Sequence, residues 1–160
     1  MGNLEQLTKF LNSQEVRFET LIHPQAFTAQ EVAHALHKTG KVLAKTIVVE
    51  ADGKIVMTVV PAHHKVNLGA VKKVVGAEDV HLVPETKLRE LFPESDLGAM
   101  PPLGPMYNLP VIVSKALAEE PEIIFNASTH TDCVKMNYAD FARIVNPTVA
   151  EVSDIPPEAR

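Results

Sequence analysis

Residues 41–61, KVLAKTIVVEADGKIVMTVVP, constrain the fold more than any other stretch of the chain. Two runs rich in Val, Ile and Thr flank the dipeptide Asp52-Gly53, and this combination is one of the stronger sequence signals for a β-hairpin. The stretch therefore predicts two antiparallel strands joined by a tight turn. A hairpin at this position is incompatible with a purely parallel sheet built only of βαβ units.

The segments around this hairpin alternate between helical and extended patterns. Residues 3–13 carry Leu and Phe on one helical face, Thr28 begins a capping-box pattern, and Asn67 and Gly76 bracket a further helix. Short strands are predicted at residues 16–22, 80–84, 109–117, 122–128, 132–138 and 148–155. Together these patterns predict a mixed α/β fold, a sheet flanked by helices, formed by one domain over residues 1–160.

Composition and charge narrow the classes of protein to consider. No apolar run reaches the roughly 18 residues of a membrane helix, and the N-terminus lacks a secretory signal pattern. The single cysteine, Cys133, excludes an internal disulfide and suits a reducing cytoplasm. A formal charge of −5 argues against broad binding to DNA or RNA, but it is compatible with contact to one RNA end through a few cations.

Lys45 is the exceptional residue of the first hairpin strand. On a strand, Leu43, Lys45, Ile47 and Val49 share one face, and Lys45 is the only charged member of this row. One interpretation is that its aliphatic stem packs on the sheet while the ammonium reaches water. The other is that the ammonium lies at the mouth of a pocket and binds an anion such as a phosphate.

The loop LGAMPPLGPM, residues 97–106, is unusually apolar and rich in Gly and Pro. Glycine lets a backbone approach a ligand closely, while proline fixes φ and removes a competing donor. The loop is therefore either a rigid connection between elements or a frame that holds backbone groups in place, as an oxyanion site requires.

Other polar residues give weaker signals. His130 lies in a cluster of Thr and Asp that suits a turn as well as a site, and Cys133 nearby allows a Cys-His nucleophile to be considered. His63 and His64 are adjacent, so on a strand they point to opposite faces and do not suit joint metal ligation. We predict neither a metal nor an organic cofactor.

Five stretches in order resemble one known family, the YbaK family, also called the prolyl-tRNA synthetase-associated editing domain. They are HPQAFTAQEVA (23–33), AKTIVV (44–49), GAMPPLG (98–104), LPVIV (109–113) and FNASTHTDCVKMNYADFARI (125–144). The resemblance implies a strongly curved, barrel-like mixed sheet surrounded by helices. It also implies a free-standing, trans-acting aminoacyl-tRNA deacylase, which hydrolyses the ester of tRNA mischarged with a small amino acid such as Ala, Ser or Cys.

The resemblance also implies a set of site residues. Lys45 matches the family lysine that contacts the phosphate near the 3′-terminal adenosine, and Gly98 to Pro102 match its Gly-x-x-x-Pro loop. The implied catalytic residues are Lys45, Gly98 and Pro102, and the implied substrate-binding residues are Thr46, Ala99, Met100, Pro101, Gly104, Ser128 and His130. The implied partners are the acceptor end of aminoacyl-tRNA, with Lys65, Lys72 and Lys73 as further contacts, and an aminoacyl-tRNA synthetase.

Two positions depart from the family pattern. Many relatives carry Gly where Ser128 stands and Asp where Ser114 stands. Ser128 is expected to narrow or repolarise the pocket, whereas Ser114 at a strand end is expected to bear on structure. The departure at Ser128 keeps open a second hypothesis, a catalytically weak module that binds tRNA or a synthetase, and Cys133 keeps open a third, a cysteine hydrolase.

Overall fold

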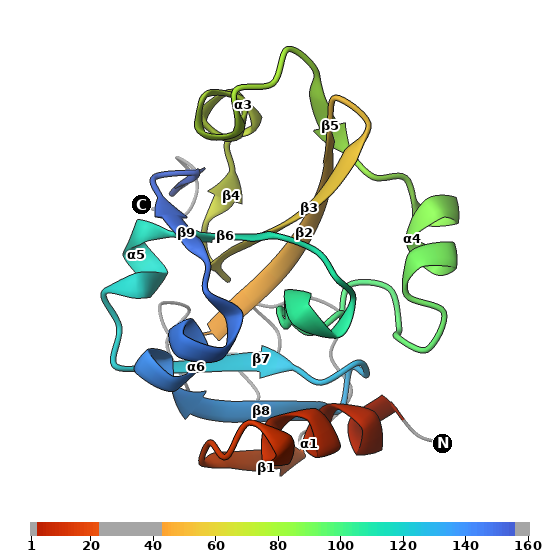
Figure 1. Cartoon of the computed structure of the whole chain (residues 1–160), viewed down its shortest axis with the longest axis vertical. Helices are drawn as coiled ribbons and strands as arrows, with labels where there is room; N and C mark the ends of the chain where they lie inside the picture. The colour runs from red at the N-terminus through yellow and green to blue at the C-terminus, as the bar shows by residue number, and fades with distance from the viewer. Residues whose placement is uncertain (1–2, 23–42, 156–160) are drawn as a thin grey trace.

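The computed structural model of the chain describes residues 3–22 and 43–155 (Figure 1). The helix predicted from Thr28, and the first of the family-like stretches, residues 23–33, lie outside the described residues. The helices are α1 (Asn3–Ser13), α3 (Leu68–Val75), α4 (Glu85–Leu91), α5 (Lys115–Ala118) and α6 (Tyr138–Val145), with a 3-10 turn η1 (Gly104–Met106). The strands are β1 (Phe18–Ile22), β2 (Leu43–Ala51), β3 (Lys54–Pro61), β4 (Lys65–Val66), β5 (Val80–Leu82), β6 (Val111–Ser114), β7 (Glu122–Asn126), β8 (Asp132–Asn137), β9 (Thr148–Ala150) and β10 (Ser153–Asp154).

The predicted hairpin is confirmed. Strands β2 and β3 pair antiparallel from Ala44 opposite Pro61 to Ala51 opposite Lys54. Both turn residues have positive φ, 49° at Asp52 and 84° at Gly53, as a two-residue turn that matches the twist of the strands requires. The predicted helix between Asn67 and Gly76 is also confirmed, since the Asn67 side chain accepts a hydrogen bond from the Ala70 N–H and Gly76 ends the helix at φ 67°.

The main sheet is mixed, as the sequence predicts. Its strand order is β1-β8-β7-β2-β3-β6-β9, with β5 added beside β2, and β4 and β10 form a separate pair. The pairs β2–β7, β3–β6 and β6–β9 are parallel, and the others are antiparallel. Figure 1 shows that the strand direction turns strongly between β7–β8 and β2–β3, so the sheet is curved rather than flat.

Two apolar clusters cover opposite faces of this sheet. The larger contains Ala44 and Val48 of β2 together with residues of α1 and α6. The smaller contains Val49 and Val60, with Ile47 packed against it, and joins the sheet to α3. The two faces of β2 are thus both covered by protein, which explains why its sequence is almost continuously apolar.

Several predicted strands are shorter than expected, and the strand predicted over residues 148–155 is divided into β9 and β10, which belong to different sheets. Residues 109–117 form a strand only over Val111–Ser114, and Lys115–Ala118 turn into α5. Ser114 stands at this change and Leu117 of the helix is fully buried, so burial of an apolar side chain outweighs the extended pattern. Within the described residues no helix is long and apolar enough to cross a membrane.

Candidate functional site

Lys45 lies on the face of β2 that also carries Ile47 and Val49, as its position in the strand predicts. Its side chain is half-buried, and burial lowers the pKa of its ammonium group. Among the described residues no carboxylate pairs with Lys45. A half-buried cation without a counter-ion is costly for a protein, and it is therefore a ready contact for an incoming anion.

Thr46, the next predicted site residue, points the other way. Its side chain is 8% exposed and shares a face with Ala44 and Val48, which belong to the larger apolar cluster. The two neighbours Lys45 and Thr46 therefore lie on opposite faces of β2.

The Gly/Pro loop exposes only one of its predicted site residues. Residues 99–104 are buried, whereas Gly98 is exposed and has φ 82°. A tight turn, in which the Ala99 N–H donates to the Asp96 carbonyl at 3.0 Å, sets this conformation. Within residues 98–104 the backbone around Gly98 is therefore the part open to a ligand, because the side chains of Met100 and Leu103 belong to the apolar core.

Hydrogen bonds join this loop to the segment between β7 and β8. The Asp96 N–H donates to the Ser128 carbonyl at 2.8 Å, and the Ser128 N–H donates to the Ala99 carbonyl at 2.9 Å. The Nε2–H of His130 donates to the Leu97 carbonyl at 2.8 Å. Two stretches about thirty residues apart in sequence, 96–99 and 128–130, thus form one hydrogen-bonded unit, which we call the loop unit. It brings Gly98, Ser128 and His130 together.

Ser128 has a left-handed backbone, with φ 76°. This conformation is energetically unfavourable for any residue that has a side chain, but not for glycine. The difference is a physical reason for glycine at this position in the family pattern. Residues around it form the turn that the sequence allowed, with Thr129 Oγ1 donating to Asp132 Oδ2 at 2.7 Å and the Ala127 N–H donating to the Asp132 carbonyl at 2.9 Å.

The pairing of β2 with β7 brings the start of β2 next to the end of β7. Strand β7 runs parallel to β2, with Phe125 opposite Ala44, so β7 ends next to the residue that precedes Lys45. The chain then continues directly into Ser128 and His130. The backbone of Lys45 therefore lies next to the end of the strand that leads into the loop unit, although the two are far apart in sequence.

Cys133 does not have the environment of a nucleophile. Its side chain is fully buried, its Sγ lies 3.6 Å from Asn126 Oδ1, and burial together with the charge of Asp132 raises the pKa of its thiol to about 12. The thiolate is the reactive form, so this thiol is inert near neutral pH.

The described residues contain no group of three or more His, Cys, Asp or Glu side chains arranged to hold a metal ion. His63 and His64 contact each other edge to face at a ring distance of 4.5 Å, and His64 instead hydrogen-bonds to Ser153.

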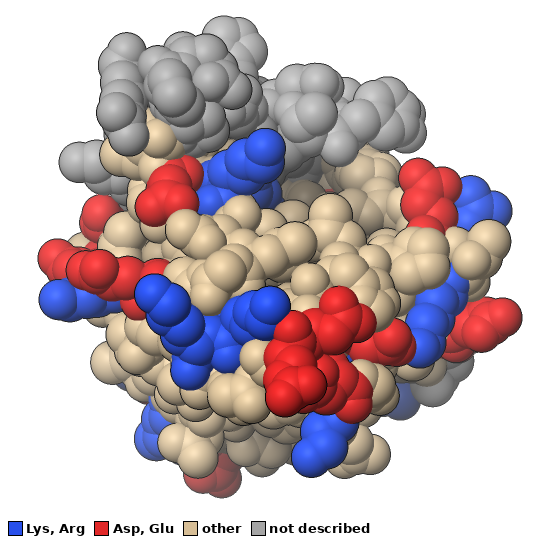
Figure 2. All heavy atoms as spheres, turned by 90° about the horizontal axis from the view of Figure 1, so that it is seen from above, with Lys and Arg blue, Asp and Glu red and all other residues tan. Residues whose placement is uncertain are grey.

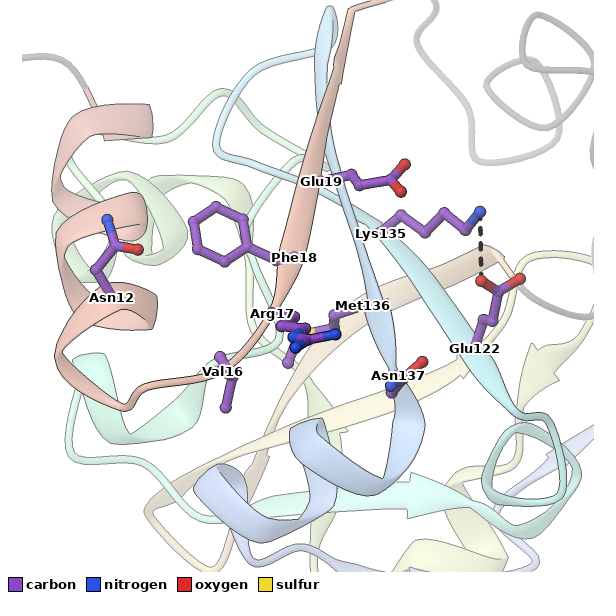
Figure 3. Close-up of a pocket in the computed structure, with 9 residues that line it drawn as sticks. All are labelled: Asn12, Val16, Arg17, Phe18, Glu19, Glu122, Lys135, Met136 and Asn137. Carbon is purple, nitrogen blue, oxygen red and sulfur yellow. Dashed lines mark ion pairs between the residues drawn. The ribbon is translucent and has the colours of Figure 1, made fainter.

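A pocket of about 600 Å³ lies elsewhere, beside β1 and the ends of β7 and β8 (Figure 3). Phe18 points toward α1, whereas Glu19, Lys135 and Glu122 point to the other side of the sheet, and Lys135 pairs with Glu122 at 3.3 Å. It contains none of the predicted site residues. We therefore take Lys45, which has no carboxylate partner among the described residues, together with the exposed turn of the loop unit, as the candidate site.

A smaller cavity of about 150 Å³ lies behind the loop unit. Tyr107, Ser95 and Ser128 contribute polar groups to its lining, and Phe92 and Met106 contribute apolar ones. Burial raises the pKa of the Tyr107 phenol, and hydrogen bonds to Ser95 and Ser128 oppose this rise. Tyr107 and Ser128 thus interact across this cavity, a contact for which the sequence contains no local signal.

The predicted RNA-contact lysines, Lys65, Lys72 and Lys73, are all exposed. Figure 2 shows one face of the molecule, on which basic and acidic side chains form adjacent groups. Elsewhere in the structure, Lys72 lies close enough to Asp52 to help lower the pKa of that carboxyl group, after the stronger effect of the backbone N–H groups of Asp79 and Glu78. On this face the described residues form no continuous basic surface.

Solved structures with the same fold support the architecture. One, a hypothetical protein, superposes with a TM-score of 0.85 at 19% identity, over 92% of this chain and 99% of its own. Another, a protein provisionally described as a trans-editing enzyme for prolyl tRNA synthetase, has a TM-score of 0.82 at 19% identity, over 96% of this chain and 98% of its own. These likenesses define the class of fold, a mixed α/β domain with a curved sheet.

Sequence comparison identifies the family. A profile of the aminoacyl-tRNA editing domain matches residues 23–144, and the chain belongs to this family. Proline--tRNA ligase of Bacillus mycoides (strain KBAB4) is 29% identical over 104 residues, 65% of this chain and 18% of the ligase. That of Staphylococcus saprophyticus is 34% identical over 86 residues, 53% of this chain and 14% of the ligase. The chain thus spans less than a fifth of the length of these curated relatives.

Proposed function

We propose that this protein is a trans-acting aminoacyl-tRNA deacylase. It hydrolyses the ester that joins a small amino acid, such as Ala, Ser or Cys, to the 3′-terminal adenosine of a wrongly charged tRNA. Membership of the editing-domain family supports the reaction class, and the likeness to a protein described as a trans-editing enzyme over 98% of its length supports action in trans.

The observation that carries this proposal is the strand register, which sets Ala44, the residue before Lys45, opposite Phe125 near the end of the strand that leads into the loop unit. Lys45 is a half-buried cation without a described counter-ion, on a strand whose neighbour leads into Ser128 and His130. Gly98 is exposed in the same unit, and no described residue accepts a hydrogen bond from its N–H. A cation for a phosphate and a free N–H for a carbonyl oxygen are the two contacts that an aminoacyl ester of tRNA needs.

The reaction follows from these contacts without a protein nucleophile. Water attacks the ester carbonyl carbon, and the negative charge that develops on the carbonyl oxygen is stabilised by the Gly98 N–H. The bond from the carbonyl carbon to the ribose oxygen then breaks, the ribose oxygen takes up a proton, and the free amino acid leaves. Because an aminoacyl ester is already activated, positioning and charge stabilisation suffice. Pro101 and Pro102 fix φ next to this turn and keep its backbone in place.

The choice of a small amino acid is expected to depend on size. A closely packed pocket rejects larger side chains by steric overlap, whereas one extra methylene in a roomy pocket changes binding by only about 1–3 kcal/mol. Ser128 is buried at the loop unit, where glycine would leave more room. We therefore expect Ser128 to restrict the substrate to the smallest side chains.

The decisive experiment is a deacylation screen over tRNAs charged with Ala, Ser and Cys, comparing wild type with Lys45→Ala. We expect Lys45→Ala to lower kcat/KM by about a hundredfold, the scale of losing one charge-stabilising contact. Lys54→Ala, which removes an exposed lysine from the far end of the same hairpin, is the matched control and is expected to keep full activity. Unchanged turnover in Lys45→Ala would refute the role of this residue.

The loop is tested in the same assay by Gly98→Asn. Asparagine tolerates positive φ better than other residues with a side chain, so the fold is kept, whereas a β-branched residue such as Val would also strain the backbone. The added Cβ points toward His130, 3.6 Å from its Cε1, and places bulk over the exposed turn. We expect turnover to fall far more than stability, and full turnover would identify the loop as a simple connector.

A second function is kept because Ser128 replaces a glycine of the family pattern. The protein would then bind charged tRNA or a synthetase without hydrolysis. Binding of all charged tRNAs in the screen without release of any amino acid would favour this function over the deacylase.

A further inference from the structure

A chain of side-chain hydrogen bonds lies on the same face of the sheet as Lys45. His64 Nδ1 lies 2.8 Å from Ser153 Oγ, and Ser153 Oγ lies 2.7 Å from Ser114 Oγ. His64 follows β3, Ser153 begins β10 and Ser114 ends β6, so three segments meet here. His64 is 8% exposed and Ser114 is 2% exposed, which makes this a largely buried polar cluster.

Strand register places this cluster beside Lys45. Lys45 lies opposite Val60 of β3, and Val59 lies opposite Val113 of β6, so Val60 separates Lys45 from Ser114 in one row across three strands. Val60 belongs to the smaller apolar cluster, as does Ile112, two residues before Ser114. The side chains of the row therefore share one face.

Backbone hydrogen bonds hold the segment that carries His64 against the start of β2, next to the row formed by Lys45, Val60 and Ser114. The Ala62 N–H donates to the Leu43 carbonyl at 2.7 Å, and the His64 N–H donates to the Pro61 carbonyl at 2.9 Å. Since the imidazole is tied through Nδ1 to Ser153, its Nε2 is the nitrogen left for another contact. Among residues 3–22 and 43–155, none hydrogen-bonds to that Nε2.

We propose that His64 is a second contact for the anion bound at Lys45, with the Ser153–Ser114 pair orienting the imidazole so that its Nε2–H reaches the phosphate of the terminal nucleotide. This inference rests on the proposed function for the identity of the anion. It adds a substrate-contacting residue that supplies a positive charge only when protonated, and two positioning residues that hold it.

The charges around His64 determine the direction of its pH dependence. Burial lowers the pKa of His64 most, the charges of His63 in its own segment and Lys45 on β2 lower it further, and Asp154 on β10 raises it. The free protein therefore holds a neutral imidazole at neutral pH. A bound phosphate adds negative charge beside the ring and raises its pKa, so binding takes up a proton and is tighter at lower pH.

The test uses the dinucleotide cytidylyl-(3′→5′)-adenosine as the probe, because its phosphodiester stays ionised from pH 6 to 8.5. Adenosine, which lacks the phosphate, is the control ligand. We expect wild type to bind the dinucleotide about tenfold more tightly at pH 6 than at pH 8.5, the scale of one charge-assisted hydrogen bond. His64→Gln, which keeps a hydrogen-bonding group for Ser153 but has no titratable charge, is expected to lose this pH dependence, whereas adenosine binding should not change.

Further variants separate orientation from charge and from folding. Ser153→Ala keeps the imidazole but removes its fixed partner, so we expect weaker binding with a reduced pH dependence. His81→Gln, on β5 beside Glu50 and Asp79, is the matched control and should behave as wild type. Should His64→Gln fail to fold, the NMR titration of His64 in wild type decides, since its midpoint must rise when the dinucleotide is added.

An unshifted His64 midpoint, or the same pH profile of dinucleotide binding in His64→Gln and wild type, would overturn the inference. These measurements do not depend on turnover. Absence of deacylation with an intact pH-dependent phosphate site would therefore refute the proposed function and leave the His64 contact standing.

Discussion

Replacing Ser128 by alanine and by glycine tests the backbone conformation that links the Gly/Pro loop to the strands. Ser128 has φ 76° and is 3% exposed, and its N–H and carbonyl hold Ala99 and Asp96 respectively. Both replacements remove the Ser128 hydroxyl, which interacts with the Tyr107 phenol, but only glycine relieves the left-handed conformation. Comparing the two variants therefore separates the effect of losing the hydroxyl contact from the energetic cost of the left-handed backbone.

The expected magnitudes follow from three contributions. Loss of the polar contact between the Ser128 hydroxyl and the Tyr107 phenol costs each variant up to about 1 kcal/mol. A residue with a side chain pays about 1–2 kcal/mol for the left-handed conformation, which glycine avoids. Glycine in turn gains about 0.4–1 kcal/mol of conformational freedom in the unfolded chain. We therefore expect Ser128→Ala to lower the free energy of unfolding by about 1 kcal/mol, and Ser128→Gly to be about 1 kcal/mol more stable than Ser128→Ala.

Urea unfolding of the three proteins, followed by circular dichroism, measures these differences. In thermal unfolding the difference between the two variants corresponds to about 2–4 °C in Tm for a domain of this size. A Ser128→Ala protein at least as stable as Ser128→Gly would show that the backbone at this position is not left-handed, and the reasoning about the loop unit would fail.

Three further predictions concern other parts of the molecule. Gly104→Ala places a Cβ into the Leu109 carbonyl and the Val111 side chain, so urea unfolding should show a loss of about 3 kcal/mol or more, whereas Gly69→Ala on exposed α3 should stay within about 1 kcal/mol of wild type. Cys133, whose thiol pKa is raised to about 12, should resist iodoacetamide at pH 8 in the native protein and react once urea unfolds it; equal rates in both states, read by mass spectrometry, would contradict its burial. The backbone N–H groups of Asp79 and Glu78 lower the pKa of Asp52, so its ionised form stabilises the fold above the pKa of the unfolded state and this contribution is lost as the pH falls. Asp52→Asn should accordingly be less stable than wild type at pH 7, and this difference should narrow toward pH 3; a constant difference across this range would argue against the charge.

Much of the architecture could be predicted because its signals are local. Asp52-Gly53 specifies a turn with positive φ, Asn67 and Gly76 delimit a helix, and each acts through backbone groups only a few residues away. The mixed sheet follows from the same local patterns. The strand predicted over residues 109–117 was too long, because the burial of Leu117 in a short helix is a tertiary effect that the extended pattern does not contain.

The candidate site could be predicted only in part. The position of Lys45 within an apolar row was readable from strand alternation, and so was the unusual composition of the loop at Gly98. Resemblance to the family, rather than these patterns alone, joined the two into one hypothesis. The resemblance marks Ser128 as a departure from the family pattern, but its left-handed backbone is visible only in the structure.

The sequence by itself determined most of the secondary structure, the class of fold and the family, because turn chemistry, capping and side-chain periodicity act over short distances along the chain. Only the tertiary structure decided that the loop reaches Ser128 and His130, and that His64 is tied to Ser153 and Ser114. The physical reason is that such contacts depend on strand order and register. Residues as far apart as His64 and Ser153 meet only when the whole sheet has formed, and no local pattern encodes that meeting.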